Sequence, residues 1–247
     1  MAVHYRTKGF FITEIARGES DKLFVVYTKD FGKLKILGKA IRKIKSKLRG
    51  GARELCLSEV EFIQGKTHKT LTDTVLIDSF PEFRKDLEKL KTAFQISNAL
   101  DRLVKGEQKD EQIWDLLNDV FNKLNNRFLF PVSCFLIYYY FLWNLLSLLG
   151  YQPELYKCSF CGKGLKPFQL YFGTGQGGAV CNICAQKIKK EDSLEKLMEI
   201  KPDVIKILRL FLQKDWSVLS KLKVEEKHQK SLEKISEYYL CSSLENS

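Results

Sequence analysis

Two Cys-x-x-Cys pairs constrain the fold of this chain more than any other feature. They are Cys158-Ser-Phe-Cys161 and Cys181-Asn-Ile-Cys184, with nineteen residues between them. This spacing matches a four-cysteine zinc site, in which each pair presents two thiolates to one tetrahedral ion. Two redox pairs or a pair of disulfides are the alternatives, but a redox pair usually occurs singly beside a βαβ pattern. Four thiolates leave no open position for water, so we expect one structural Zn²⁺ and no catalytic metal.

Charge and cysteine usage narrow the class of protein. The 247 residues carry 41 Lys and Arg against 30 Asp and Glu, a formal net charge of +11, which suggests a polyanionic partner. The seven cysteines are an odd number, which argues against a secreted disulfide scaffold. Zinc thiolates and free thiols both suit a reducing cytosol. The first residues include no apolar segment typical of a signal peptide, so we expect a cytoplasmic protein.

The first 80 residues predict strands. Aromatic and β-branched runs, or alternating apolar residues, are separated by turns at Asp30-Phe31-Gly32 and Gln64-Gly65-Lys66. The expected strands are 3–15, 22–28, 33–37, 54–64 and 74–80. Five short strands with glycine turns suggest a small barrel. Most of its aromatic side chains should form the core, although any of them could stack on a base: Tyr5, Phe10, Phe11, Phe24, Tyr27 and Phe31.

After Pro81 the apolar period becomes helical. Three sets of apolar residues each share a helical face: Phe83, Leu87, Leu90, Ala93 and Phe94; Ile113, Leu116, Leu117, Val120, Phe121 and Leu124; Val204, Ile207, Leu208 and Phe211. Pro202 suits the first position of the third helix. A charged helix is expected over about 224–240. We therefore expect a helical domain of residues 81–154 and 191–247, with a zinc module of residues 155–190 inserted in it.

Residues 128–152 contain no charged side chain, and the run is long enough to span a membrane as a helix. It includes Pro131, Ser133, Asn144, Ser147 and four tyrosines, whose polar groups would need partners in hydrocarbon. A helix that is apolar all round is also typical of the centre of a helical domain. We expect a buried core helix and no membrane span. A membrane-anchored protein, the alternative, would pellet with membranes.

The densest charge cluster, here called the basic run, lies between residues 33 and 49. No Asp or Glu occurs between Asp30 and Glu54. A basic groove on a barrel can follow a phosphate backbone, and neutralising phosphates releases counterions. A solvated loop and a basic amphipathic helix on an anionic membrane remain alternatives. The predicted nucleic-acid contacts are Lys33, Lys35, Lys39, Arg42, Lys43, Lys45, Lys47 and Arg49.

A smaller basic bias surrounds the four cysteines. No acid occurs between Glu154 and Glu191, whereas six lysines do: Lys157, Lys163, Lys166, Lys187, Lys189 and Lys190. The module could be a second nucleic-acid-binding surface or a protein-binding surface. Alternatively, it could only stabilise the fold, with the lysines keeping its surface solvated. Motifs of catalysis are absent: there is no phosphate loop, dinucleotide fingerprint or nucleophile elbow. We therefore expect no enzyme.

Several motifs, taken together over about residues 5–185, resemble the bacterial RecO family of recombination mediators and DNA repair proteins. They are Lys8-Gly9, Glu19-Ser20-Asp21-Lys22-Leu23, Thr28, Gly32, the basic segment of residues 38–46, and Leu149-Gly150-Tyr151-Gln152-Pro153-Glu154-Leu155 leading into Cys158 and Cys161-Gly162. The last motif is similar to that of zinc-bearing members. The helix after about residue 221 matches no pattern of the family.

The resemblance implies an α+β multidomain protein with an N-terminal five-stranded OB-fold β-barrel, followed by an all-α domain with an inserted four-cysteine zinc module. It also implies binding to single- and double-stranded DNA and annealing of complementary strands. RecR, the C-terminal tail of single-strand DNA-binding protein (SSB) and the RecA pathway are the implied partners, at the nucleoid in the cytoplasm. The rival functions are an RNA-binding zinc protein of translation or RNA processing and a protein-interaction adaptor.

Overall fold

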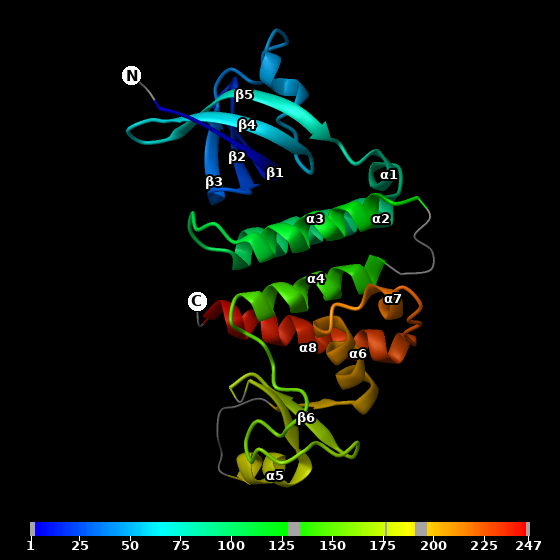
Figure 1. The fold of residues 1–247 in the computed structure, drawn as a ribbon. Coiled ribbons are helices and arrows are strands. Elements are labelled where there is room, and N and C mark those ends of the chain that lie inside the picture. Colours follow the sequence, from blue (N-terminus) through cyan, green and yellow to red (C-terminus); the bar gives the residue numbers. More distant parts are fainter. Residues whose placement is uncertain (1–2, 128–133, 176, 191–196, 246–247) are drawn as a thin grey trace. The chain divides into compact units, whose positions relative to one another are not determined.

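The computed structural model describes residues 3–127, 134–175, 177–190 and 197–245. Contacts group the chain into two compact units, Met1–Leu129 (unit 1) and Phe130–Ser247 (unit 2). Unit 1 contains a barrel and the helices α1 to α3, and unit 2 contains the remaining helices and a small sheet (Figure 1). The predicted domain boundaries after residues 80, 154 and 190 stay predictions.

Five strands of unit 1 close into a barrel in the order β1-β2-β3-β5-β4. They are β1 (His4–Arg17), β2 (Asp21–Thr28), β3 (Gly32–Gly38), β4 (Leu57–Gln64) and β5 (Lys69–Asp78). The pairs are antiparallel except β3 with β5, which pair in parallel at Ile36↔Lys69 and Leu37↔Thr70. The predicted five-stranded OB-fold barrel is confirmed.

Two predicted strands begin at the wrong residue by more than one position, and two end at the wrong one: β1 at Arg17 and not at residue 15, and β5 at Asp78 and not at residue 80. β4 begins at Leu57 and not at residue 54, because Leu55 has a left-handed φ of 59° that breaks the extended backbone before the strand. β5 begins at Lys69 and not at residue 74. Its polar first half pairs with β3 and β4 through backbone groups, which do not depend on apolar side chains.

Neighbouring residues of β1 serve two different apolar layers, because successive side chains point to opposite faces of a strand. Phe11 meets Phe24 edge-on in the barrel interior, with ring centroids 5.1 Å apart. Phe10 instead contacts Trp114 and Phe121 at 5.1 and 5.3 Å. The prediction that most barrel aromatics are core residues is confirmed: Phe10, Phe11, Phe24 and Tyr27 are buried, whereas Tyr5 and Phe31 are partly buried.

The helices of unit 1 are α1 (Pro81–Arg84), α2 (Leu87–Leu103) and α3 (Glu111–Asn125). Asp86 and Asp110 cap α2 and α3 by accepting hydrogen bonds from backbone N–H groups of the first turn. The predicted apolar face of α3 is buried as expected. The predicted face of α2 is wrong at Leu87 and Phe94, which are 78% and 38% exposed, whereas Ala93 is buried as predicted. The chain breaks between α1 and α2, so the period read from Phe83 does not continue, and the buried face runs through Ala93, Ile96, Leu100 and Leu103.

Unit 2 is built around α4 (Cys134–Leu148). The indole N–H of Trp143 donates to Ser236 Oγ at 2.9 Å, and its ring stacks on Tyr239 at 5.2 Å. The prediction of a buried core helix is therefore confirmed for residues 134–148, whereas Pro131 and Ser133 lie outside the described residues. In the part of the chain that the structure describes, no helix combines the length and the apolarity needed to cross a membrane.

The other helices of unit 2 are α5 (Asn182–Lys190), α6 (Pro202–Leu212), α7 (Trp216–Leu219) and α8 (Glu226–Glu245). Pro202 is the first residue of α6, and the predicted apolar face of that helix is buried. Three strands form a sheet in the order β7-β6-β8: β6 (Leu170–Gly173), β7 (Gly178–Cys181) and β8 (Leu197–Ile200). None of these three strands has a counterpart among the predicted elements, and β8 lies within residues 191–247, which were expected to be helical.

Candidate metal centre and nucleic-acid interface

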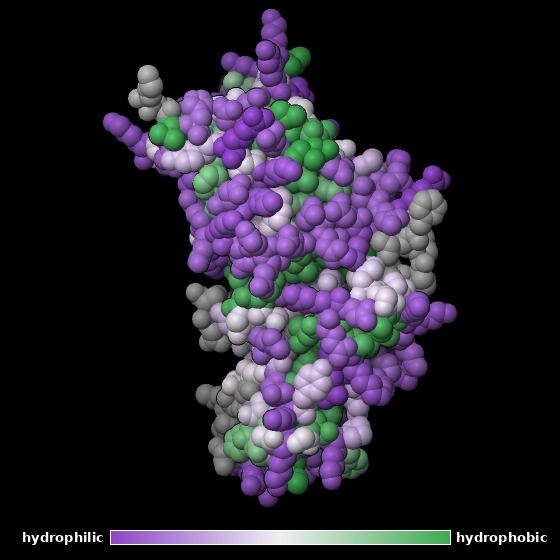
Figure 2. Space-filling view, in the orientation of Figure 1, coloured by the Kyte–Doolittle hydropathy of each residue, from purple (hydrophilic) through white to green (hydrophobic). Residues whose placement is uncertain are grey.

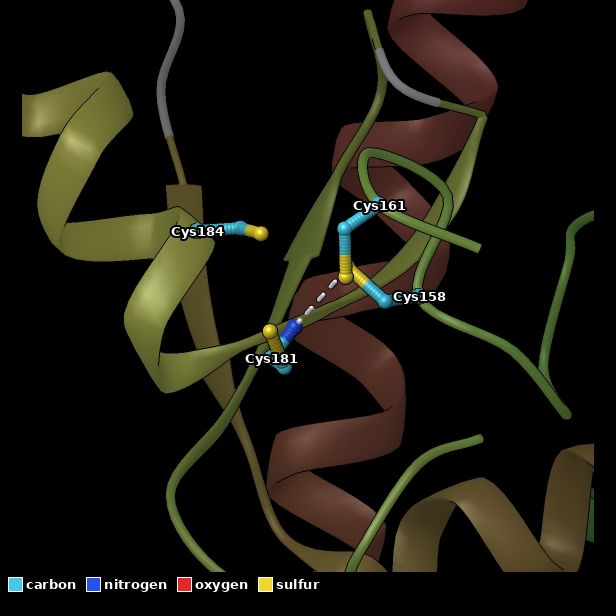
Figure 3. Close-up of side chains that lie close together, drawn as sticks. All are labelled: Cys158, Cys161, Cys181 and Cys184. Atoms are coloured by element: carbon cyan, nitrogen blue, oxygen red, sulfur yellow. Dashed lines mark hydrogen bonds between the residues drawn. The ribbon is translucent and has the colours of Figure 1, made fainter. Parts of the chain in front are cut away.

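The four cysteines of the two Cys-x-x-Cys pairs come together in unit 2. All four Sγ atoms lie within 4.8 Å of one another, and Figure 3 shows their side chains converging on one point. Tetrahedral thiolates about 2.3 Å from a zinc ion place their sulfurs roughly 3.8 Å apart. The arrangement therefore fits one Zn²⁺ with small side-chain adjustments.

Each pair is held by a different local structure. The first is on a hairpin in which the Cys158 N–H donates to Lys163 O and the Gly162 N–H to Cys158 O, both at 2.8 Å. In the second pair, Cys181 ends β7 and Cys184 lies in the first turn of α5. The backbone N–H of Cys181 donates to Cys158 Sγ at 3.4 Å (Figure 3). Backbone N–H groups that point at sulfur favour the thiolate form, which is the form that binds metal.

Electrostatics also favour a cation between the sulfurs. Burial, followed by hydrogen bonding among the thiols, raises the pKa of Cys184. Burial opposes ionisation of Cys158 too, but backbone N–H groups outweigh it and lower the pKa of that thiol to about 7. The cluster therefore cannot hold four negative charges unaided. A divalent cation removes this conflict, because bound thiols are deprotonated.

Gly178 allows the two halves of the metal site to meet. The backbone of Glu154, just before the first pair, receives a hydrogen bond from Ala179 N–H at 2.8 Å and donates to Gly177 O at 2.9 Å. A Cβ on Gly178 would lie 2.3 Å from Glu154 O, and the φ of this residue is 157°. Only glycine fits this close approach.

The basic run lies on and after β3 in unit 1. Lys35 is on β3, Lys39, Arg42, Lys43 and Lys45 are in the following loop, and Lys47 and Arg49 are in the short helix η1 (Lys47–Gly50); all seven are exposed. Residues 39–45 form turns and a bend, so the amphipathic-helix alternative is wrong for this segment. Asp21 anchors the loop by accepting from the Ala40 N–H at 2.7 Å, and this hydrogen bond lowers the pKa of the Asp21 carboxyl.

Part of the basic run frames a pocket on the barrel surface. The pocket, here called the basic pocket, has a volume of about 400 Å³ and is lined by Lys22, Ile41, Arg42, Arg49, Ala52 and Arg53. Lys22 donates to Glu14 at 2.6 Å, whereas no described carboxylate forms an ion pair with the three arginines. Guanidinium groups without a carboxylate partner can bind phosphate oxygens with two parallel hydrogen bonds. Sequence reasoning missed Lys22 and Arg53, because they lie outside the run and reach the pocket only through the fold.

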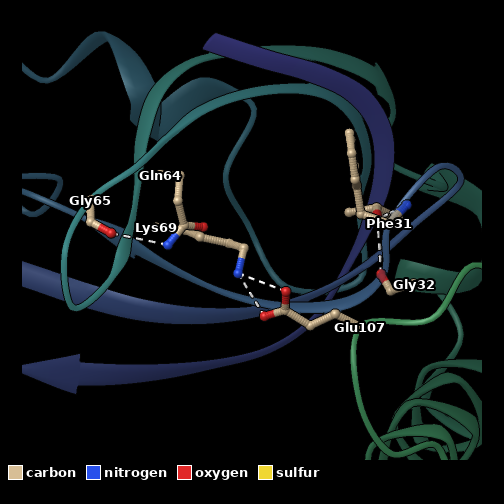
Figure 4. A network of polar contacts seen from close by, with 7 residues as sticks. Phe31, Gly32, Gln64, Gly65, Lys69 and Glu107 are labelled. Atoms are coloured by element: carbon tan, nitrogen blue, oxygen red, sulfur yellow. Dashed lines mark hydrogen bonds and ion pairs between the residues drawn. The ribbon is translucent and has the colours of Figure 1, made fainter. Parts of the chain in front are cut away.

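Lys33 differs from the rest of the basic run. Its Nζ donates to Asp101 O at 2.6 Å and to Asp101 Oδ1 at 3.1 Å, and its side chain is 13% exposed. Lys69 makes the same kind of contact, reaching both carboxylate oxygens of Glu107 at 2.6 and 2.8 Å (Figure 4). Both lysines connect the barrel to the segment around the end of α2. The structure therefore directs Lys33 toward α2 and away from solvent.

Comparison with known proteins gives a consistent result over nearly the whole chain. Residues 1–80 match the family model described as "Recombination protein O N terminal", and residues 84–247 match "Recombination protein O C terminal". Similar curated proteins, each named DNA repair protein RecO, occur in Dehalococcoides mccartyi strain CBDB1, Thermoanaerobacter sp. strain X514 and Acetivibrio thermocellus. They are 29%, 28% and 28% identical over 93%, 92% and 98% of this chain, and over 86%, 88% and 92% of their own lengths.

Proposed function

Because this chain belongs to the recombination protein O family of DNA repair and recombination, we propose that it is a non-catalytic recombination mediator. In this role it binds single- and double-stranded DNA, anneals complementary strands, and acts with RecR to help load RecA onto SSB-coated DNA. It contacts the C-terminal tail of SSB and works at the nucleoid in the cytoplasm. The observation that carries the proposal is the basic pocket, together with the exposed cations beside it on the barrel.

The proposed DNA surface consists of the basic pocket and the exposed part of the basic run. Arg42 and Arg49 belong to the basic pocket and also to the basic run. One DNA strand can therefore bind in the pocket and continue along the exposed lysines of the run. Buried barrel aromatics are not available for stacking, so binding on this surface rests on phosphates. Such binding is tolerant of base sequence, as annealing of arbitrary complementary strands requires.

Charge neutralisation explains how this surface promotes annealing. Two complementary strands repel each other through their phosphates, and bound cations lower that repulsion. A strand held on the barrel also raises the local concentration of the second strand once that strand binds nearby. Base pairing then supplies the specificity, so the protein itself need not read bases.

The zinc site has a structural part in this proposal. Cys158, Cys161, Cys181 and Cys184 would hold one Zn²⁺, which supplies folding free energy to the module and no chemistry to the DNA. Without the ion, the hairpin of the first pair and the start of α5 would lose their shared anchor.

Strand annealing is the direct test. Two complementary oligonucleotides coated with cognate SSB are mixed with the zinc-loaded protein, and the rate of duplex formation is followed by fluorescence. We expect the wild type to accelerate annealing and the triple variant Arg42→Glu, Arg49→Glu, Arg53→Glu to lose the acceleration. A matched variant with the same charge change, Lys221→Glu, Lys223→Glu, Lys234→Glu, uses exposed lysines of unit 2 and should keep it.

Each other outcome has a definite meaning. No acceleration by the folded wild type would contradict the mediator proposal, and tighter binding to a matched RNA oligonucleotide would then favour the RNA-binding alternative. Equal loss in both triple variants would show that net charge matters and not this surface.

The affinity for single-stranded DNA should also depend strongly on salt. With about six phosphate contacts, the association constant should fall on the order of 10²–10³-fold between roughly 50 and 200 mM salt, because bound cations release counterions. Titration of labelled oligonucleotide at several salt concentrations measures this slope. A flat response would contradict phosphate-based binding.

A further inference from the structure

The zinc module exposes three large apolar side chains. Phe160 is 52%, Phe168 67% and Ile183 70% exposed. The core of the module lies elsewhere, around Val180, Ala185 and Ile188. The space-filling view shows apolar and polar residues intermixed on the part of unit 2 that carries β6 and α5 (Figure 2). Exposing large aromatic side chains to water is unfavourable, so such groups often mark a binding surface.

The three side chains are linked to the cysteine cluster through the chain and the small sheet. Phe160 directly precedes Cys161 and Ile183 directly precedes Cys184, and the sulfurs of these cysteines belong to the same cluster. Phe168 lies two residues before Leu170, which opposes Cys181 in the pairing of β6 with β7. The side-chain amide of Asn182 donates to Gln169 Oε1 at 2.7 Å, which ties the residues next to Phe168 and Ile183 together. Phe160, Phe168 and Ile183 are here called the apolar rim.

The chain segment that carries the apolar rim, residues 155–190, contains basic residues and no Asp or Glu. The six lysines of the module are all exposed: Lys157, Lys163, Lys166, Lys187, Lys189 and Lys190. In the described residues none of them forms an ion pair with a carboxylate, although Lys189 lies over the Tyr171 ring at 4.3 Å. A zinc ion with four thiolates has a formal double negative charge, which the six lysines more than offset. The module therefore keeps a net positive surface even with the metal bound.

From this combination we propose that the zinc module is a second binding surface for single-stranded DNA, on which bases stack on Phe160 and Phe168 while the lysines contact phosphates. Aromatic side chains within a basic surface are the features that bind single strands without reading sequence. A duplex would bury its bases away from the rim, so the occupant is a single strand. The inference rests on the proposed function. In it, the barrel holds one DNA strand and the zinc module holds the complementary strand.

Photo-crosslinking of the zinc-loaded, full-length protein tests this surface independently of annealing. The probe is an oligothymidine in which iodouracil replaces some of the bases, because this base crosslinks to aromatic side chains stacked on it. We expect crosslinked peptides that contain Phe160 or Phe168, identified by mass spectrometry. Crosslinks confined to peptides of residues 1–127 would overturn the inference.

Annealing by variants gives the second readout. Phe160→Ala with Phe168→Ala should slow annealing by about tenfold or more, the expected effect of losing base stacking, and Phe160→Trp with Phe168→Trp should restore it. Leu87→Ala with Phe94→Ala removes exposed apolar side chains from α2 in unit 1 and should leave annealing unchanged. Retained zinc in each variant, measured by a chromogenic chelator, shows that the module is folded.

The outcomes separate this inference from the proposed function. Normal annealing by the double alanine variant, with crosslinks on barrel peptides alone, would reject the module surface and leave the mediator role standing. Neither crosslinks nor annealing by wild type would reject both. Unchanged DNA binding with loss of a protein complex in the alanine variant would identify the rim as a protein dock, which also overturns the inference.

Discussion

Individual residues of the same type have different roles in this protein, depending on where the fold directs them. Lys33 and Lys35 are both on β3 and belong to the same basic run, but only Lys35 is exposed. Lys33 is one residue from a buried core position and reaches Asp101. A lysine whose ammonium group donates to a carbonyl and a carboxylate is less available to bind phosphate than an exposed lysine. Membership of the basic run therefore does not by itself indicate a DNA contact.

Paired substitutions on β3 should separate stability from DNA affinity. Lys33→Met removes two hydrogen bonds to Asp101 and should lower the free energy of unfolding of unit 1 by about 1–3 kcal/mol. Lys35→Met should leave stability unchanged and weaken binding to single-stranded DNA. Amide exchange of β3 and α2 measures the first effect, and oligonucleotide titration measures the second. The reverse pattern would show that Lys33 is a DNA contact.

At the scale of elements, the metal site depends on a close approach between the segment before the first cysteine pair and β7. The contacts are made by backbone groups of Glu154, Gly177 and Ala179, with Gly178 between them. Because the first pair follows Glu154 and the second pair begins at the last residue of β7, this approach sets the distance between the two pairs of sulfurs. A small change there should affect metal binding without altering any ligand.

Gly178→Ala should weaken zinc retention. The added Cβ meets the Glu154 backbone at distances of 2.3 to 2.9 Å, so the strand must shift, at a cost on the order of 1–3 kcal/mol. Zinc release to a chromogenic chelator measures the effect. Gly164→Ala is the matched control, because a Cβ at Gly164 meets nothing within 4 Å. Equal zinc retention in both variants would contradict the role of this close approach.

At the scale of the whole molecule, the barrel and the metal site belong to different compact units. Each unit has its own apolar core: one around Phe11 and Phe24 in the barrel, and one that includes Trp143 and Tyr239 in unit 2. Because the barrel core contains no metal ligand, its packing does not require zinc.

Cys158→Ser should therefore remove zinc and order only from the module. We expect amide exchange to become fast over residues 155–190, while the strands of unit 1 keep their protection and most helical circular dichroism remains. Cys241→Ser changes an exposed cysteine outside the metal cluster and should keep both zinc and protection. Complete loss of helical circular dichroism in Cys158→Ser would refute independent folding of the units.

Local patterns of residues account for what could be predicted. The metal cluster followed from the spacing of four cysteines, because tetrahedral thiolate coordination demands that pattern. The barrel and the buried face of α3 followed from apolar periodicity, and the core helix α4 followed from a long run without charged residues. Periodicity failed for α2, where the break at Asp86 resets the helical phase, and for β5, where backbone pairing extends into polar residues.

By itself, the sequence determined the four cysteines of the candidate metal site, the five-stranded barrel and the positive charge of the basic run. Only the tertiary structure decided which cations act together: it brought Lys22 and Arg53 beside Arg42 and Arg49 and directed Lys33 toward Asp101. Only the tertiary structure also left Phe160, Phe168 and Ile183 exposed. The physical reason is that ligand spacing and periodicity are properties of short segments, whereas a pocket and an exposed face depend on which distant segments the folded chain packs together.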